Sequence, residues 1–356
     1  MKTSAIVICI LLASLSSASI PMAQETSCLG LYTVADTLYK QGKWSAATQV
    51  GKQALAKSKL SGGPYDLSTI KSLELLGKIK RDQGKLGDAG IFCNKALKAN
   101  TAFFGEEHPN AVKALIRKAD LAERRSEDTL AKALYSRAID ISHKAGRGDD
   151  ISVTPALVSL GDLYRNEGNP TKAEEFYKRA LVTYETLCKY RPYIAMNIAQ
   201  IYRNLGSIDF NRKKYDRASV DYRKALAKYE KIGGSNSVEA ADTRMNLGDT
   251  YTNWHKPARA ERQFRKALAI YQKLGGTNDI KAAITLKRLG DLYFAKGNHP
   301  RSERSYTKAV AVLKKCSPTC RTTLASAMKA LADLRMRRGD HAKAVPLYKS
   351  VLAILK

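Results

Sequence analysis

One phrase recurs along this chain at a nearly constant interval. The segment Leu160-Gly-Asp-Leu-Tyr164 precedes Gly168, and Leu289-Gly-Asp-Leu-Tyr293 precedes Gly297 at the same separation. The equivalent position, called here the turn position, falls at residues 42, 84, 126, 168, 213, 255, 297 and 339, with gaps of 42 residues except for one of 45. This regularity predicts eight copies of one unit that bury a continuous core only by stacking on each other.

Each repeat is predicted to be a pair of helices. Apolar and small residues recur at helical spacing on both sides of the turn position, where glycine suits a tight turn with positive φ. Alanine stands five residues after the turn at 47, 89, 131, 173, 218, 260 and 344, and an aromatic residue follows at 135, 177, 222, 264, 306 and 348. We therefore expect an all-α protein, an α-solenoid of about eight helix-turn-helix repeats forming a superhelix over residues 24–356.

These residues and separations resemble the tetratricopeptide repeat. The period of 42 residues is longer than the usual unit of that family and is similar to the variant found in kinesin light chains, a likeness to which His108-Pro109 adds. Ser126, Lys213 and His255 depart from the pattern by replacing the turn glycine, at about 1–2 kcal/mol each if left-handed geometry is kept. Those three turns are therefore candidates for remodelling.

The first 23 residues have the features of a secretory signal peptide. Lys2 supplies the positive start, an apolar stretch runs over residues 5–15, and small residues such as Ala18 and Ala23 offer cleavage positions. We expect an exported protein, periplasmic or extracellular, with no transmembrane span after cleavage; an uncleaved N-terminal anchor is the alternative. The stretch is shorter than the roughly 20 residues that a spanning helix needs.

Positive charge dominates the composition. Lys and Arg number 61 against 33 for Asp and Glu, giving a net charge of +28 that attracts anionic partners. Cations stand eleven residues after the turn, on the predicted second helices, at 95, 137, 179, 224, 266 and 308. They form either a solvated surface or a face for an anionic polymer. Nucleic acid is not an expected partner, because some of the tyrosines fill repeat positions and no stacking platform can be recognised.

An acidic ladder stands on the predicted first helices. Six residues before the turn lie Asp36, Asp120, Asp162, Asp249, Asp291 and Asp333. The resemblance implies that first helices line a concave groove. Lys40, Arg124, Arg165 and Arg337 can pair with four of these acids along their own helices, so a purely structural ladder is one interpretation. Asp249 and Asp291 have no basic residue at the corresponding positions and are predicted to be free for a ligand.

Polar and aromatic residues of the fifth to seventh repeats complete the candidate site. Asparagine amides offer a donor and an acceptor to an extended peptide backbone, and aromatic rings offer apolar seats. The resemblance implies a peptide-gripping role for such asparagines. Besides Asp249 and Asp291, the predicted peptide-binding groove contains Asn204, Asn246, Asn211, Asn253, Arg203, Lys287, Phe210 and Phe294.

Neither catalysis nor a cofactor is expected. No Ser-His-Asp or Cys-His grouping, phosphate-binding glycine loop or metal-ligand set can be placed, so we predict no catalytic residues, no metal and no cofactor. Export into an oxidising compartment favours a disulfide between Cys316 and Cys320 across a proline-containing loop. Apolar residues of the last helix, including Leu347, Val351 and Leu352, face no following repeat and predict a homodimer.

Two functions from different classes remain. The first is an exported scaffold that binds an extended segment of a protein partner in its groove. The second is a structural or adhesion protein associated with anionic envelope polymers through its basic surface.

Overall fold

A computed structural model describes residues 27–275, 279–315 and 320–355. These residues form helices and turns and no strand. The chain divides into two compact units, unit 1 up to Leu163 and unit 2 from Tyr164. The predicted signal peptide lies outside the described residues, as does Cys316 of the predicted disulfide, whereas its partner Cys320 is described and buried.

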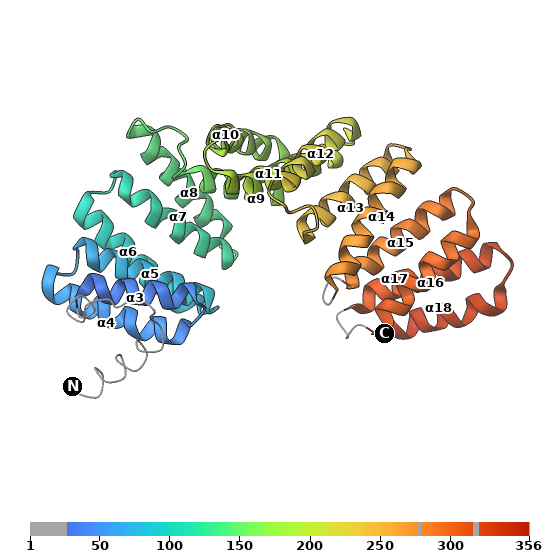
Figure 1. The fold of residues 1–356 in the computed structure, drawn as a ribbon, viewed down its shortest axis with the longest axis horizontal. Coiled ribbons are helices and arrows are strands. Elements are labelled where there is room, and N and C mark those ends of the chain that lie inside the picture. Colours follow the sequence, from blue (N-terminus) through green and yellow to red (C-terminus); the bar gives the residue numbers. More distant parts are fainter. Residues whose placement is uncertain (1–26, 276–278, 316–319, 356) are drawn as a thin grey trace. The chain divides into compact units, whose positions relative to one another are not determined.

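Unit 1 is a stack of helical hairpins (Figure 1). Each first helix packs against the second helix of its own repeat, and each second helix packs against the next first helix, in the order α3 to α7. The helices are α3 (Cys28–Lys40), α4 (Trp44–Gly62), α5 (Leu67–Asp82), α6 (Leu86–Phe104), α7 (Pro109–Arg124), α8 (Asp128–Lys144) and α9 (Thr154–Asn166), whose last residues belong to unit 2.

Unit 2 repeats the same packing from α10 to α18. The three additional residues between the fourth and fifth turns coincide with a short 3-10 helix, η1 (Pro192–Ile194). The helices are α10 (Pro170–Cys188), α11 (Ala195–Asn211), α12 (Tyr215–Lys231), α13 (Val238–Asn253), α14 (Pro257–Leu274), α15 (Asp279–Ala295), α16 (His299–Lys315), α17 (Arg321–Arg337) and α18 (His341–Leu355). The predicted fold class, helix-turn-helix repeats in an all-α solenoid, is confirmed.

The turn between the helices of a repeat is a left-handed cap. In the fourth repeat Gly168 has φ 80°, and the amide of the following Asn169 donates to the carbonyl of Tyr164 at 2.8 Å. Such a bond closes the helix end by satisfying a carbonyl that the helix leaves open. Lys213 keeps the same geometry, with φ 60° and a bond of 2.8 Å from Lys214 to the carbonyl of Asp209.

None of the three turns without glycine is remodelled. Ser126 and His255 have φ 60° and 53°, so both remain in the left-handed region together with Lys213. The alternative of remodelled turns is therefore wrong. The packing on both sides of each turn fixes the chain direction and outweighs the local strain.

The core follows the predicted repeat positions. The alanines five residues after the turn, from Ala47 to Ala344, are all 0% exposed, which lets the two helices of a repeat approach closely. The aromatic rings Tyr135, Tyr177 and Phe264 are at most 1% exposed. Glycine on the facing first helix makes room for the ring, because a Cβ at Gly290 would lie 2.5 Å from Cε1 of Tyr306.

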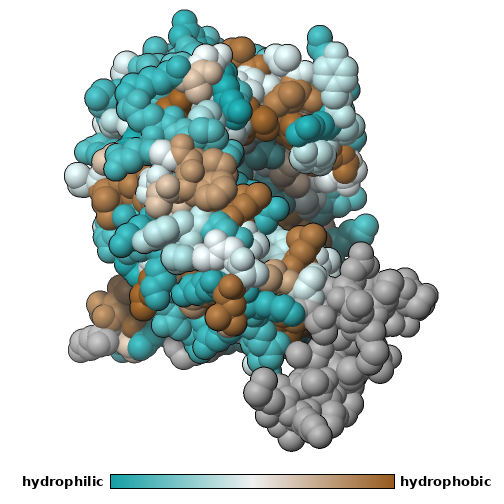
Figure 2. All heavy atoms as spheres, turned by 90° about the vertical axis from the view of Figure 1, so that its left-hand side faces the viewer, coloured by the Kyte–Doolittle hydropathy of each residue, from teal (hydrophilic) through white to brown (hydrophobic). Residues whose placement is uncertain are grey.

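Apolar side chains reach the surface at several places. On the face shown in Figure 2, hydrophilic side chains separate the apolar ones into small patches. On the last helix, Leu352 and Leu355 are more than 60% exposed, whereas Val351 is buried at 8%. The homodimer through this end stays a prediction. None of the described helices is both long and apolar enough to span a membrane.

Candidate functional site

The predicted groove residues of unit 2 lie on consecutive first helices. Helices α11, α13, α15 and α17 are the first helices of the fifth to eighth repeats, and contacts join α11 to α13 and α15 to α17. The 42-residue period places Asn204 in register with Asn246, and Asp249 in register with Asp291 and Asp333. These residues therefore form rows that run from repeat to repeat.

Three of the six ladder acids, Asp120, Asp291 and Asp333, accept a hydrogen bond from their own repeat. The tyrosine hydroxyl fifteen residues later donates to the acid, at 2.7 Å from Tyr306 to Asp291 and at 2.5 Å from Tyr348 to Asp333. In unit 1, Tyr135 donates to Asp120 at 2.7 Å. A hydrogen bond to an ionised carboxylate contributes about 1.5–3 kcal/mol, so these acids hold the two helices of a repeat together.

Asp249 differs because its repeat carries no such hydroxyl. The equivalent aromatic residue is Phe264, and Asp249 instead pairs with Arg288 of the next first helix at 3.3 Å. The side chains of Asp249 and Arg288 are 28% and 47% exposed. Burial raises the pKa of Asp249; Arg288 opposes that shift and Asp291 adds to it. This acid is therefore partly buried, incompletely neutralised and still open to solvent.

The expectation that Asp249 and Asp291 lack basic partners is wrong. Lys287 pairs with Asp291 at 3.0 Å, and Arg288 pairs with Asp249. The prediction considered only basic residues that follow an acid on its own helix. Lys287 precedes its acid by one turn, and Arg288 comes from another repeat. Asp36 pairs with Lys40 at 2.6 Å, as expected.

The predicted asparagines divide into two kinds. Asn204 is 7% exposed and donates to the Tyr177 hydroxyl at 3.2 Å, so it belongs to the packing between repeats. The amide of Asn253 donates to the backbone carbonyl of Asp249 at 2.9 Å. Asn246 is half-buried, and its backbone carbonyl accepts from Thr250 at 2.7 Å. Asn246 lies one turn from Asp249 on α13 and is the better candidate for contact with a ligand.

The remaining groove candidates lie around the turns and on α11. Phe210 packs edge-on against Tyr215, with ring centroids 5.8 Å apart, and Phe294 lies under the guanidinium of Arg337 at 4.8 Å. Asn211 is exposed at the end of α11, and Arg203 is half-buried on the same helix. Their role in peptide binding stays a prediction.

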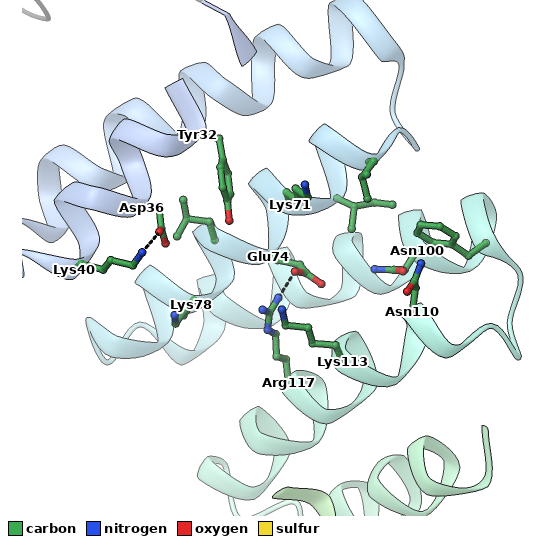
Figure 3. A pocket seen from close by; sticks show the side chains of 14 residues that line it. Tyr32, Asp36, Lys40, Lys71, Glu74, Lys78, Asn100, Asn110, Lys113 and Arg117 are labelled. Atoms are coloured by element: carbon green, nitrogen blue, oxygen red, sulfur yellow. Dashed lines mark ion pairs between the residues drawn. The ribbon is translucent and has the colours of Figure 1, made fainter. Parts of the chain in front are cut away.

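Sequence reasoning missed a pocket in unit 1. It has a volume of about 480 Å³ and lies among first helices α3, α5 and α7, with α6 at one wall (Figure 3). Tyr32 and Asp36 come from α3, and Arg117 of α7 pairs with Glu74 of α5 at 2.5 Å. A signal was present in the sequence, because Lys71 and Lys113 are 42 residues apart and so occupy one repeat position.

A smaller pocket of about 180 Å³ in unit 2 gathers acids beside α10, α11 and α12. Burial raises the pKa of Asp221 to about 6 against the pull of Lys224, and the nearby acids Asp209 and Glu174 add to the rise. No group of described residues has the composition of a metal site. Arg212 and Lys178 both form ion pairs with Glu174, at 2.6 and 2.7 Å, so neighbouring basic side chains neutralise much of the negative charge of this cluster.

The basic row of the second helices is used in part by internal contacts. Arg137 pairs with Glu106 at 2.9 Å, and the ammonium of Lys224 lies 5.0 Å from the ring centroid of Tyr202. Exposed pairs of this kind contribute about 0–1 kcal/mol, so they leave the cations accessible to an anionic surface. Association with an anionic polymer stays a prediction.

The comparisons with known proteins agree with this architecture. Two family models, both described as tetratricopeptide repeat, match residues 197–273 and 255–315 and residues 156–187 and 327–356. No curated protein matches the chain.

Solved structures share the fold at low sequence identity. BtubC (BKLC) from P. vanneervenii is 24% identical, with a TM-score of 0.52 over 65% of this chain and 90% of that one. The apo form of RapI is 13% identical, with a TM-score of 0.67 over 92% and 97% of the two chains. The apo form of the quorum sensor NprR from B. thuringiensis is 14% identical, with a TM-score of 0.59 over 100% and 94%. This chain belongs to the tetratricopeptide repeat family.

Proposed function

We propose that this chain is an exported scaffold that binds an extended segment of a partner protein along the first helices α11, α13 and α15, and that it does no covalent chemistry. The tetratricopeptide repeat supports an interaction scaffold, since stacked repeats create long surfaces for other chains. Export rests on the composition of residues 1–23.

The Asp249–Arg288 pair carries the proposal. It connects α13 to α15 and presents a carboxylate and a guanidinium side by side, both partly exposed. A pair with this exposure contributes only about 0–1 kcal/mol, so a ligand can exchange with either partner at small cost. In the same rows Asp291 and Asp333 accept hydrogen bonds from tyrosine hydroxyls, so their carboxylates are less available to a ligand.

Asn246 extends the pair into a surface suited to a peptide. Its amide lies one helical turn before Asp249 and can both donate to and accept from a peptide backbone. A partner segment with a basic side chain could contact Asp249, one with an acidic side chain could contact Arg288, and its backbone could reach Asn246. The repeat register would then set the direction of the bound chain.

The test is cross-linking mass spectrometry of the protein in its native compartment. The variant carries Asp249→Asn with Arg288→Gln, and we expect it to lose the cross-links that join α13 and α15 to a partner. The control carries Asp216→Asn with Arg217→Gln, which makes the same charge changes at exposed positions of α12. An unchanged set of partners and cross-linked residues in the first variant would show that the site is wrong.

Salt dependence separates this proposal from adhesion to anionic polymers. Several cation–phosphate or cation–polymer contacts lose affinity steeply as salt rises, because bound counterions are released on association. Capture through the first helices, with few charged contacts, should change little over the same range. A steep loss that persists in the Asp249→Asn, Arg288→Gln variant would favour the basic surface instead.

A further inference from the structure

The unit 1 pocket has more cations than its own acids can neutralise. Five cations and two acids line it. Asp36 forms an ion pair with Lys40 at 2.6 Å, and Glu74 forms one with Arg117 at 2.5 Å, so both acids of the pocket are already paired.

Three cations of the pocket therefore remain without an acid. Lys71 and Lys113 are exposed, and no acid among the described residues lies within ion-pair distance of either or of Lys78. The ammonium of Lys78 lies 4.7 Å from the ring centroid of Tyr39, which leaves its charge in place. Figure 3 shows Lys71 and Lys78 on α5 and Lys113 on α7 around the same opening.

A buried amide in the pocket wall has an unmet hydrogen bond. Asn100 of α6 is 2% exposed, and its Oδ1 has no hydrogen-bond partner among the described residues. A buried acceptor left without a donor costs about 1–3 kcal/mol, so a ligand with an N–H group would regain that energy. The amide can present its oxygen or its nitrogen by turning about its last bond.

We propose that this pocket binds an acidic segment of a partner protein. The segment's carboxylates contact Lys71, Lys78 and Lys113, and a backbone amide satisfies Asn100. The inference deepens the proposed function and rests on it for the statement that the ligand is a protein. A pocket of about 480 Å³ lies within the roughly 300–1,000 Å³ that binding pockets commonly have.

The fixed acids of the pocket favour a peptide over a continuous polyanion. Glu74 and Asp36, each paired with a basic residue, lie among the unpaired lysines, so a strand with a phosphate at every step could not place each of its charges against a free cation. An acidic segment alternates carboxylates with neutral backbone groups, so it can place its charges at the lysines and its amides at Asn100 and Asn110. The polar lining suits such backbone contacts.

The test is the fluorescence polarisation of short labelled peptides with the full mature chain. One peptide alternates Glu with Gly, and a second carries Gln in place of Glu. We expect saturable binding of the Glu peptide and about tenfold or greater loss with the Gln peptide. Lys71→Gln with Lys113→Gln should cause a similar loss, since about 1.4 kcal/mol in binding corresponds to tenfold.

The control is Lys52→Gln with Lys98→Gln, which removes the same charge from exposed positions on α4 and α6 outside the pocket. It should retain wild-type affinity for the Glu peptide. Equal losses in the control and the pocket variant would overturn the proposal, because net charge alone would then explain binding. A single-stranded oligonucleotide that binds more tightly than the peptide, and loses that affinity only in the pocket variant, would overturn the ligand class.

The two proposals fail separately. The Asp249→Asn, Arg288→Gln variant should bind the Glu peptide like the wild type, since those residues belong to unit 2. If that variant loses its partner while Lys71→Gln with Lys113→Gln leaves peptide affinity unchanged, only the acidic-segment inference is wrong. If the reverse holds, only the unit 2 site is wrong.

Discussion

The left-handed turns without glycine predict a gain in stability from a single substitution. Ser126 and Lys213 both have φ 60°, in unit 1 and unit 2 respectively. A residue with a Cβ costs about 1–2 kcal/mol in this region, whereas glycine has no such cost. Ser126→Gly and Lys213→Gly should therefore stabilise the repeats that contain them.

The size of the gain follows from two opposing effects. Relief of the left-handed strain favours glycine, and the larger conformational freedom of glycine in the unfolded chain opposes it by about 0.4–1 kcal/mol. The net stabilisation should be about 0.5–1 kcal/mol, equivalent to about 1–4 °C in the melting temperature of a unit of this size. His255→Gly should gain less, because histidine is enriched among residues with positive φ.

The assay is urea unfolding followed by circular dichroism, with Gly168→Ala and Gly297→Ala as reciprocal controls. A Cβ at either glycine would meet nothing within 4 Å, so any loss there comes from the backbone alone. Both controls should lose about 0.5–1 kcal/mol. Unchanged or lowered stability in Ser126→Gly and Lys213→Gly, with the controls destabilised as expected, would show that packing around these turns depends on the native side chain.

Two further changes test the core and the buried acid. Gly290→Ala should destabilise unit 2 by about 1–3 kcal/mol in a thermal melt, because the new Cβ meets the Tyr306 ring at 2.5 Å, whereas Gly87→Ala, with open space around it, should be neutral or stabilising. Asp221 has its pKa raised from 3.8 to about 6, so the folded state holds its proton more tightly and stability should fall as pH rises through that interval. Asp221→Asn should remove that fall from urea midpoints measured between pH 4 and 7, and an equal slope in both proteins would contradict it.

The fold was predictable because the same pattern of residues occurs in repeat after repeat of the sequence. Turn positions, buried alanines and core aromatics recur, so an exception such as Lys213 does not hide the period. Its left-handed geometry was harder to foresee, since local preference opposes it and only the packed helices on each side decide it. The ion-pair partner of Asp249 was equally hard to predict. Arg288 lies on the first helix of the next repeat and not within one helical turn of Asp249.

The pocket in unit 1 could not be predicted from periodicity, because an unfilled volume depends on the sizes and directions of side chains from four helices. Only the charge pattern was visible: Lys71 and Lys113 share one repeat position, whereas the same position in the sixth repeat is Asp242. There Asp242 pairs with Lys281 at 2.8 Å and accepts from Tyr271 at 2.5 Å, so it is used within unit 2. Equivalent positions therefore line a pocket in two repeats of unit 1 and serve packing in the sixth repeat.

Both candidate sites occur where a repeat departs from the tyrosine–aspartate hydrogen bond. In the second repeat Cys93 replaces the tyrosine and Lys78 replaces the aspartate, so this hydrogen bond cannot form and Lys78 lines the pocket. In the sixth repeat Phe264 removes the hydroxyl while Asp249 remains. A repeat that satisfies its own polar groups gains stability but has little to offer a ligand. The exceptions to the repeat are therefore the positions at which function should be sought first.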